Sequence, residues 1–190
     1  ISKEFASQKK SLYQNIFTVN LFDEDVTKSN LASSFQKLSA QVEADDVFVF
    51  YIAGHGTTYE DGDYYYLPSD FRYTGSEAIA QSGISKNDLT KFLSLIKAGK
   101  TLILLDTCQS GAFLSTEARS GLTEKTAIDR LTRATGHATI AASSDLQDAM
   151  EGYNGHGIFT YTVVEGLSGK ADADNDGFIT LQEPVSYTPL

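Results

Sequence analysis

Hydrophobic residues along the chain alternate between short continuous runs and segments in which they recur at helical spacing. Short continuous apolar runs are typical of strands that are covered on both faces. The runs Val47–Ala53 and Thr101–Leu105, and a run of smaller residues at Ala138–Ala142, therefore predict three buried strands. The helical spacing predicts helices over 5–14, from Thr27 or Asn30 to Val42, and over 85–97, 127–135 and 159–167.

The segments between these elements predict two more strands. In Asn15–Phe22, apolar and polar residues alternate enough to predict a short strand. Tyr64–Leu67 predicts a short aromatic strand, half of a hairpin. Gly54-His55-Gly56 is expected to end the first buried strand, and residues 68–83 are expected to form a loop. Because helices alternate with buried strands, we predict an α/β fold with a mostly parallel central sheet and helices on both faces.

A histidine and a cysteine stand at the carboxyl ends of the two central strands, His55 after 47–53 and Cys108 after 101–105. Functional groups of such sheets gather at this edge. If the strands are neighbours, both side chains emerge in one place. An imidazole beside a thiol can take its proton and leave a nucleophilic thiolate. The N–H groups of Gly56 and Cys108 could then stabilise one oxyanion, which suits acyl transfer from a peptide bond.

Each of these residues also has a structural interpretation. A lone cysteine is most often a small buried hydrophobe, and a lone histidine is often a core or loop residue. Joint placement at two strand ends, each beside glycine, favours the catalytic interpretation. A second Gly-His-Gly sequence carries His156, but it follows a polar loop and opens a helix. His137 precedes a strand. We therefore rank His156 and His137 below His55 as candidate catalytic histidines.

Composition excludes several classes of function. The chain has 190 residues, the size of one domain, and 15 basic against 25 acidic residues give a formal net charge of −10. This balance argues against a nucleic-acid partner and favours cationic ligands such as calcium or peptides with Lys or Arg. A single cysteine excludes an internal disulfide and a zinc site built on thiolates. No apolar run approaches the roughly 20 residues that span a bilayer, so we expect no membrane partner and a cytoplasmic location.

The segments around the two candidate residues resemble the caspase-like cysteine peptidases, the caspase and metacaspase group, with a caspase domain of the bacterial type. The histidine precedes the cysteine, at the spacing of that family. The resemblance is carried by Val47–Gly56 (VFVFYIAGHG) and Leu104–Gly111 (LLDTCQSG), with support from 64–70, 140–151 and 157–166.

This resemblance implies a three-layer sandwich in which His55 is the general base, Cys108 is the nucleophile and the Gly56 and Cys108 amides form the oxyanion hole. The family's sheet begins with a strand upstream of the first helix, and no segment here supplies it. We therefore expect an N-terminally incomplete catalytic domain over 1–169, completed by a preceding segment or a partner chain. Residues 170–190 are expected to form an acidic loop and a C-terminal tail.

Asp106, two residues before Cys108, predicts the substrate preference. A carboxylate at the base of a partly buried pocket favours a cation. The resemblance implies the same, because the metacaspase-like branch has an aspartate here and binds Arg or Lys, whereas caspases have a glutamine. We expect a peptide or protein substrate cleaved after Arg or Lys; alternatively, Asp106 only orients the loop after its strand. The expected pocket wall comprises Ser143, Ser144, Asp145 and Glu151.

The polar stretch 112–126 lies where the family has its intersubunit linker. Arg119 and Lys125, and then Arg130, are candidate sites of self-cleavage during maturation. The alternative is an ordinary flexible loop.

Residues 172–183 match the calcium-loop pattern of EF-hands, in which spaced carboxylates and one carbonyl converge on a cation. The alternative is an acidic turn of structural importance only, because the preceding helix is expected to end at 166–169 and Pro184 directly follows the loop, which argues against a helix–loop–helix. The expected calcium ligands are Asp172, Asp174, Asp176, the Phe178 carbonyl, Thr180 and Glu183.

The sequence thus predicts a cysteine endopeptidase that requires no cofactor for its chemistry. Two other classes stay open. One is an inactive caspase-like module that only binds partners, and the other is a calcium-dependent interaction domain whose cysteine is incidental.

Overall fold

The computed structural model describes residues 1–7, 13–109, 121–142, 157–177 and 179 of the chain. The chain divides into two compact units by its internal contacts. Unit 1 comprises residues 1–20 and 149–190, and unit 2 comprises residues 21–148. Unit 2 contains the sheet and therefore both candidate catalytic residues.

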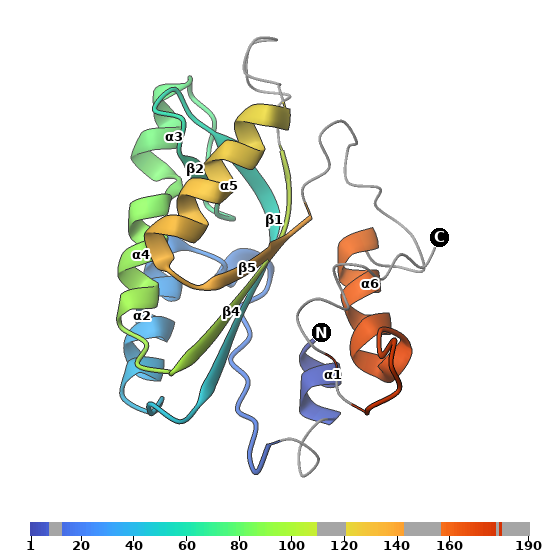
Figure 1. Ribbon diagram of the computed structural model, residues 1–190. Helices are drawn as coiled ribbons and strands as arrows, with labels where there is room; N and C mark the ends of the chain where they lie inside the picture. Colours follow the sequence, from blue (N-terminus) through green and yellow to red (C-terminus); the bar gives the residue numbers. More distant parts are fainter. Residues whose placement is uncertain (8–12, 110–120, 143–156, 178, 180–190) are drawn as a thin grey trace. The chain divides into compact units, whose positions relative to one another are not determined.

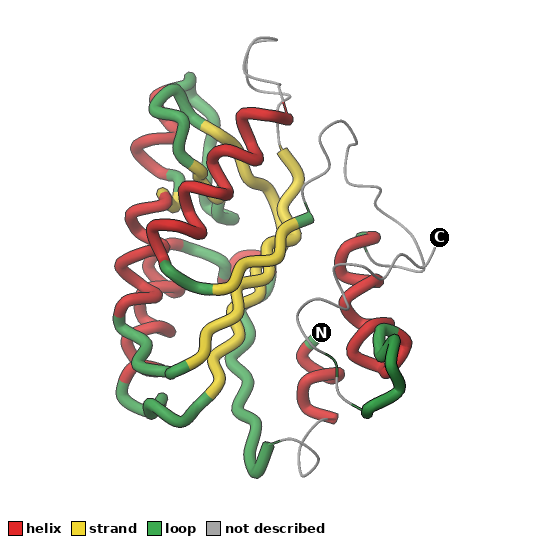
Figure 2. The backbone as a smooth tube through the Cα atoms, in the orientation of Figure 1, coloured by secondary structure: helices red, strands yellow, loops and turns green. Residues whose placement is uncertain are grey.

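Unit 2 is built on a five-stranded open sheet in the order β3-β2-β1-β4-β5 (Figure 1, Figure 2). β1, β4 and β5 are parallel, whereas β2 is antiparallel to both β1 and β3. The predicted mixed α/β fold with a mostly parallel sheet is confirmed, as is the hairpin of β1 and β2. The strands are β1 (Val47–Thr58), β2 (Tyr64–Leu67), β3 (Ile84–Ser85), β4 (Lys100–Gln109) and β5 (Ala138–Ala141).

Three helices cover one face of this sheet: α2 (Lys28–Ser39), α4 (Lys86–Ser94) and α5 (Gly121–Thr135). Side chains alternate along a strand, so every second residue of β1 and β4 faces these helices. These strand residues and the inward side chains of the helices form one core cluster. It includes Phe50, Ile52, Ile103 and Leu105 from the strands, Leu31 and Phe35 from α2, Leu89 and Leu93 from α4, and Ala127 and Leu131 from α5.

Phe35 of α2 lies at the centre of this core. Its ring centroid is 5.8 Å from that of Phe48, 5.3 Å from that of Phe50 and 5.7 Å from that of Phe92. Full burial of a side chain such as Phe35 stabilises the fold by about 1.5–3 kcal/mol. The aromatic contacts therefore join β1 to α2 and α4, and they hold the strand that carries His55.

The helix starts are specified locally, as the sequence predicts. The Thr27 hydroxyl oxygen accepts a hydrogen bond from the Asn30 amide at 3.2 Å, so Thr27 caps α2. Ser85 and Asp88 form a reciprocal capping box at the start of α4. The Lys28 ammonium donates to Asp88 at 2.6 Å and joins the two helix starts. Burial raises the pKa of Asp88, but the hydrogen bonds from Lys28 and Ser85 outweigh burial and lower it overall.

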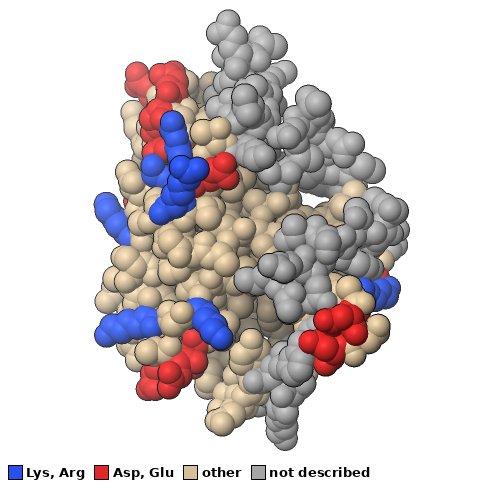
Figure 3. Space-filling view, viewed as in Figure 1, with Lys and Arg blue, Asp and Glu red and all other residues tan. Residues whose placement is uncertain are grey.

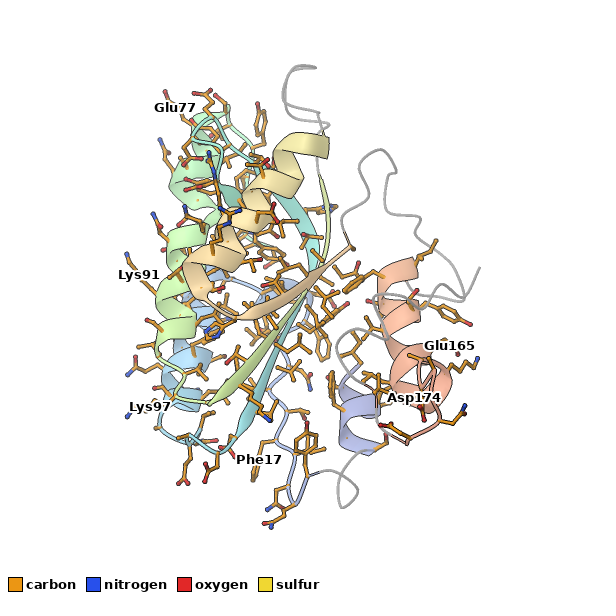
Figure 4. All side chains as sticks on the ribbon, viewed as in Figure 1. Phe17, Glu77, Lys91, Lys97, Glu165 and Asp174 are labelled. Atoms are coloured by element: carbon orange, nitrogen blue, oxygen red, sulfur yellow. The ribbon has the colours of Figure 1, made fainter. Side chains whose placement is uncertain are left out.

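The predicted strand at 15–22 is wrong: these residues form no strand. Their side chains instead include some of the most exposed apolar groups of the described chain, with Phe17 84 %, Val19 56 % and Phe22 68 % exposed (Figure 4 labels Phe17). Alternation makes a segment suitable for a strand, but a strand exists only where a neighbour accepts its hydrogen bonds. A short 3-10 helix, η1 (Asp23–Asp25), follows at the expected acidic turn.

Two other elements differ from expectation. The Gly54-His55-Gly56 sequence does not end β1, because β2 pairs with His55–Thr58 and extends the ladder. The expected loop at 68–83 contains α3 (Glu77–Ser82), where Ile79 is 2 % exposed. Packing of Ile79 stabilises a helix too short to be stable alone.

The helix expected over 127–135 begins earlier, at Gly121, and takes in part of the predicted linker. The remaining predicted elements are present, with α2 and α4 ending a few residues earlier than expected.

Unit 1 contains α1 (Ser2–Ser7), α6 (Ile158–Glu165) and a π-type turn, η4 (Gly166–Lys170). The predicted helix over 159–167 corresponds to α6. The predicted helix over 5–14 overlaps α1, but residues 8–12 lie outside the described residues. No helix within the described ranges is long and apolar enough to cross a bilayer.

Candidate active site

The structure places His55 and Cys108 opposite each other on adjacent parallel strands. β4 pairs with β1 over its whole length, and the register aligns His55 with Cys108 and Gly56 with Gln109. Neighbouring strands are about 4.8 Å apart, so the two backbones lie within reach of one substrate carbonyl. The His55 side chain is exposed and Gly56 is buried. Two residues far apart in the sequence are therefore brought together, as we predicted.

Gly54 and Gly56 are needed here because two tyrosines of β2 approach the backbone closely. A Cβ atom on Gly54 would lie 2.8 Å from the Tyr66 hydroxyl oxygen, and Gly54 has a φ of +136° that side-chain-bearing residues rarely adopt. A Cβ atom on Gly56 would lie 2.8 Å from the Tyr64 ring and 3.1 Å from the Thr107 hydroxyl. The backbone on either side of His55 is thus packed directly against aromatic rings.

Hydrogen bonds fix these tyrosines. The Tyr66 hydroxyl donates to the Ala53 carbonyl at 3.0 Å, and the Tyr64 hydroxyl donates to the Thr107 hydroxyl oxygen at 3.1 Å. Burial raises the pKa of Tyr66, so its phenol stays protonated and keeps donating at neutral pH. Tyr66 therefore braces the residue two positions before His55, and Tyr64 braces the residue just before Cys108.

Asp106 lies on β4 two positions before Cys108, opposite Ala53 of β1. Its carboxylate is half-buried and accepts a hydrogen bond from the Tyr51 hydroxyl at 3.3 Å. A carboxylate therefore lies at the strand end that carries the candidate nucleophile. The other expected pocket residues, Ser143, Ser144, Asp145 and Glu151, lie outside the described residues, as does His156. His137 is half-buried just before β5, away from this pairing.

The candidate self-cleavage sites are placed differently from one another. Arg130 lies within α5, and its guanidinium donates to the Asp61 and Gly62 carbonyls at 3.2 Å and 2.9 Å. The backbone of Lys125 also lies within α5. Arg119 lies outside the described residues.

A cluster of three carboxylates follows η4 in unit 1 (Figure 4 labels Asp174). Oxygen atoms of Asp172, Asp174 and Asp176 lie within 4.8 Å of one another. The Asp176 amide donates to Asp172 at 3.1 Å and to Asp174 at 3.2 Å, which folds the loop around the acids. Such oxygens suit Ca²⁺. The other expected ligands, at positions 178, 180 and 183, lie outside the described residues.

Sequence reasoning missed four residues around this strand end, namely Tyr51, Tyr64, Tyr66 and Thr107. The run of three tyrosines at 64–66 was the only available signal for two of them. Nothing in the local pattern distinguishes Tyr51 or Thr107 from ordinary strand residues, because their partners lie 55 and 43 residues away.

A mostly parallel α/β sheet that aligns a histidine with a cysteine at neighbouring strand ends is the framework of a cysteine-dependent hydrolase. Comparison with known families agrees: a family model described as the caspase domain matches residues 6–184. The chain therefore belongs to the caspase-domain family, which is a family of cysteine peptidases, and the resemblance noted from the sequence is confirmed. Among curated proteins, no sequence matches this chain.

Proposed function

We propose that this protein is a cysteine endopeptidase that cleaves after Arg or Lys and uses His55 and Cys108 as a catalytic dyad. The observation that carries the proposal is the register that aligns these two residues across β1 and β4. The exposed His55 side chain is accessible to a substrate. The rings of Tyr64 and Tyr66 pack closely against the glycines on both sides of His55, which favours the pre-organisation that catalysis requires.

The proposed reaction follows from the chemistry of the pair. The His55 imidazole takes the proton of the Cys108 thiol, and the thiolate attacks the carbonyl carbon of the scissile bond. The Gly56 and Cys108 N–H groups stabilise the resulting oxyanion, and each such donor contributes about 3 kcal/mol. When the tetrahedral intermediate collapses, the imidazolium gives its proton to the leaving amine and a thioester remains. A water molecule deprotonated by His55 then hydrolyses the thioester and restores the thiol.

The negative charge of Asp106 and of the whole chain supports cleavage after Arg or Lys. Asp106 offers a half-buried carboxylate near the dyad, and such a carboxylate binds a cation more strongly than a surface carboxylate does. The net charge of −10 favours approach of a basic peptide. On the face that Figure 3 shows, the Lys and Arg residues of the described part stand in small groups next to Asp and Glu, so no broad basic surface there repels such a peptide.

Fluorogenic peptides that end in Arg, Lys or Asp before the reporter group test this function. We expect the wild type to cleave the Arg and Lys peptides, and Cys108→Ala to lower the rate by at least about 10³-fold. Because Cys108 is the only cysteine in the sequence, alkylation of the protein reports on this thiol alone. Cleavage of the Asp peptide alone, or a rate that survives in Cys108→Ala, would contradict the proposal. No cleavage by a folded wild type would favour an inactive binding module.

A comparison of the wild type with Cys108→Ala also tests self-processing. We propose cleavage after Arg119, because Lys125 and Arg130 lie within α5 and a peptidase binds its substrate as an extended chain. Arg130 would also have to leave its hydrogen bonds to the β1–β2 turn. Intact mass should therefore show a break after residue 119 in the wild type and an intact chain in Cys108→Ala. Equal masses would contradict self-processing but not the peptidase activity.

The acidic loop of unit 1 favours a second property, calcium binding, through Asp172, Asp174 and Asp176 with the further ligands expected from 178–183. The carboxylate cluster supports it. The dyad chemistry uses no metal, so this property is independent of the proposed reaction.

A further inference from the structure

Tyr51 lies on β1 four positions before His55, and its register partner on β4 is Leu104. Its hydroxyl reaches past Leu104 to Asp106, two positions further along β4, and donates to the carboxylate oxygen Oδ2 at 3.3 Å. A diagonal neighbour on an adjacent strand is about 7–8 Å away, a gap that an aromatic side chain can cross. Both residues are half-buried. Tyr51 thus connects the middle of β1 to the carboxylate of Asp106, which lies two positions before Cys108 on β4.

We propose that Tyr51 is a positioning residue that orients Asp106 for the side chain of the cleavage-site arginine. This inference rests on the proposed function, because it assumes that Asp106 binds the substrate cation. A phenol donates a hydrogen bond without carrying charge, so it restrains the carboxylate and leaves its negative charge available. A lysine or arginine at position 51 would instead neutralise that charge and compete with the substrate.

The restraint matters more for arginine than for lysine. A guanidinium binds a carboxylate through two parallel N–H groups, and this fork requires both oxygens in a defined plane. An ammonium is a point charge whose three donors rotate, so it tolerates a reoriented carboxylate. The hydrogen bond from Tyr51 to Oδ2 limits rotation of the Asp106 carboxylate about its last bond. Tyr51 therefore determines how well the enzyme distinguishes Arg from Lys.

The test is Tyr51→Phe, which keeps the ring and its packing and removes only the hydroxyl. We expect KM for the Arg peptide to rise about ten-fold with kcat little changed, because the contact is made in the ground state and the transition state alike. KM for the Lys peptide should rise less. The ratio of kcat/KM for Arg over Lys should therefore fall.

Two comparisons separate this role from a structural one. Tyr65→Phe removes a tyrosine–aspartate hydrogen bond elsewhere in the sheet, from the Tyr65 hydroxyl to Asp61 at 2.9 Å. It should leave the Arg/Lys ratio unchanged. In an Asp106→Asn background, the further change Tyr51→Phe should also leave the ratio unchanged, because the carboxylate on which Tyr51 acts is absent. Thermal unfolding of each variant shows whether it is folded.

The outcomes distinguish the two proposals. If the wild type cleaves Arg peptides, and folded Tyr51→Phe keeps the wild-type KM and Arg/Lys ratio, the positioning role is wrong and the proposed function stands. A fall of the ratio that persists in the Asp106→Asn background would also overturn the role, since Tyr51 would then act by another route. If the folded wild type cleaves neither Arg nor Lys peptides, the proposed function itself is wrong.

Discussion

Two candidate sites of this protein are built in opposite ways. The strand end around His55 in unit 2 is assembled from residues far apart in the sequence and is braced by the tyrosines of β2. The acidic loop at 172–177 in unit 1 is formed by neighbours in the sequence, and the hydrogen bonds that shape it run within the loop. The geometry of the first site is set by the fold, whereas that of the second depends on local conformation.

This difference predicts how each site responds to change. A change in packing around the His55 strand end should affect both stability and catalysis, because the same contacts serve both. A change in the acidic loop should affect cation binding and leave the sheet intact. The first two of the three predictions that follow test this contrast, and the third tests a charge that lies outside both sites; the largest expected effect comes first.

Gly54→Ala should give the largest effect. The new methyl group would lie 2.8 Å from the Tyr66 hydroxyl oxygen, so either the backbone or the tyrosine must move. Gly75→Ala is a matched control, because Gly75 has nearly the same φ, +134° against +136°, and nothing within 4 Å. Both variants incur a backbone strain of about 1–3 kcal/mol. Overpacking should cost Gly54→Ala a further 1–3 kcal/mol, approximately.

Denaturant unfolding measures the difference in stability, and the peptidase assay measures the difference in activity. Displacement of the backbone next to His55 should lower kcat/KM by about ten-fold or more in Gly54→Ala. Gly75→Ala should keep the wild-type kcat/KM. If the two variants lose equal stability and keep equal activity, Tyr66 does not brace the site.

Asp174→Ala should give an intermediate effect, confined to the acidic loop. Titration calorimetry should show calcium binding to the wild type and binding weaker by at least about ten-fold in the variant, because ligand charge sets the affinity of such loops. Asp129→Ala, which removes an exposed carboxylate from α5, is the control and should bind as the wild type does. No heat from the wild type would exclude the calcium site. A loss of peptidase activity in Asp174→Ala would break the contrast between the two sites.

Asp88→Asn should give the smallest effect. Hydrogen bonds from Lys28 and Ser85 outweigh burial and lower the pKa of Asp88 in the folded state below its ordinary value of 3.8. A lowered pKa stabilises the fold above the unfolded-state pKa, and this contribution disappears as pH falls through the folded-state value. The variant should therefore lose about 0.5–1 kcal/mol at pH 7, because the Lys28 side chain is 45 % exposed and solvent weakens the ion pair.

At about pH 3, below the ordinary carboxyl pKa, this loss should shrink. Lys28→Met should remove part of the same pH-dependent increment, since it removes one of the two hydrogen-bonding partners of Asp88. A loss in Asp88→Asn that stays constant between pH 7 and pH 3 would show that the charge of Asp88 contributes nothing to stability.

Much of the fold followed from local pattern. The apolar runs predicted the central strands β1 and β4 and the strand β5, and the helical spacing with capping residues predicted α2 and α4. β5 was expected to be buried, but it lies at the edge of the sheet and its residues are half-buried or exposed. The predictions of these elements succeed because the core selects hydrophobic residues at the period of the element that it buries. The prediction at 15–22 failed for a related reason, since alternation describes what a strand needs on its faces and says nothing about the neighbour along its edge.

The spacing of the acidic loop and the position of His55 and Cys108 near the carboxyl ends of two apolar runs followed from the sequence alone, because apolar runs and closely spaced acids are properties of neighbouring residues. That both residues lie within the strands was not predicted. The alignment of His55 with Cys108, the packing of tyrosines against Gly54 and Gly56, and the contact of Tyr51 with Asp106 were decided only by the tertiary structure. A shift of one residue in the pairing of β1 and β4 would leave every local pattern unchanged and would separate these partners, since register is set by packing across the whole sheet.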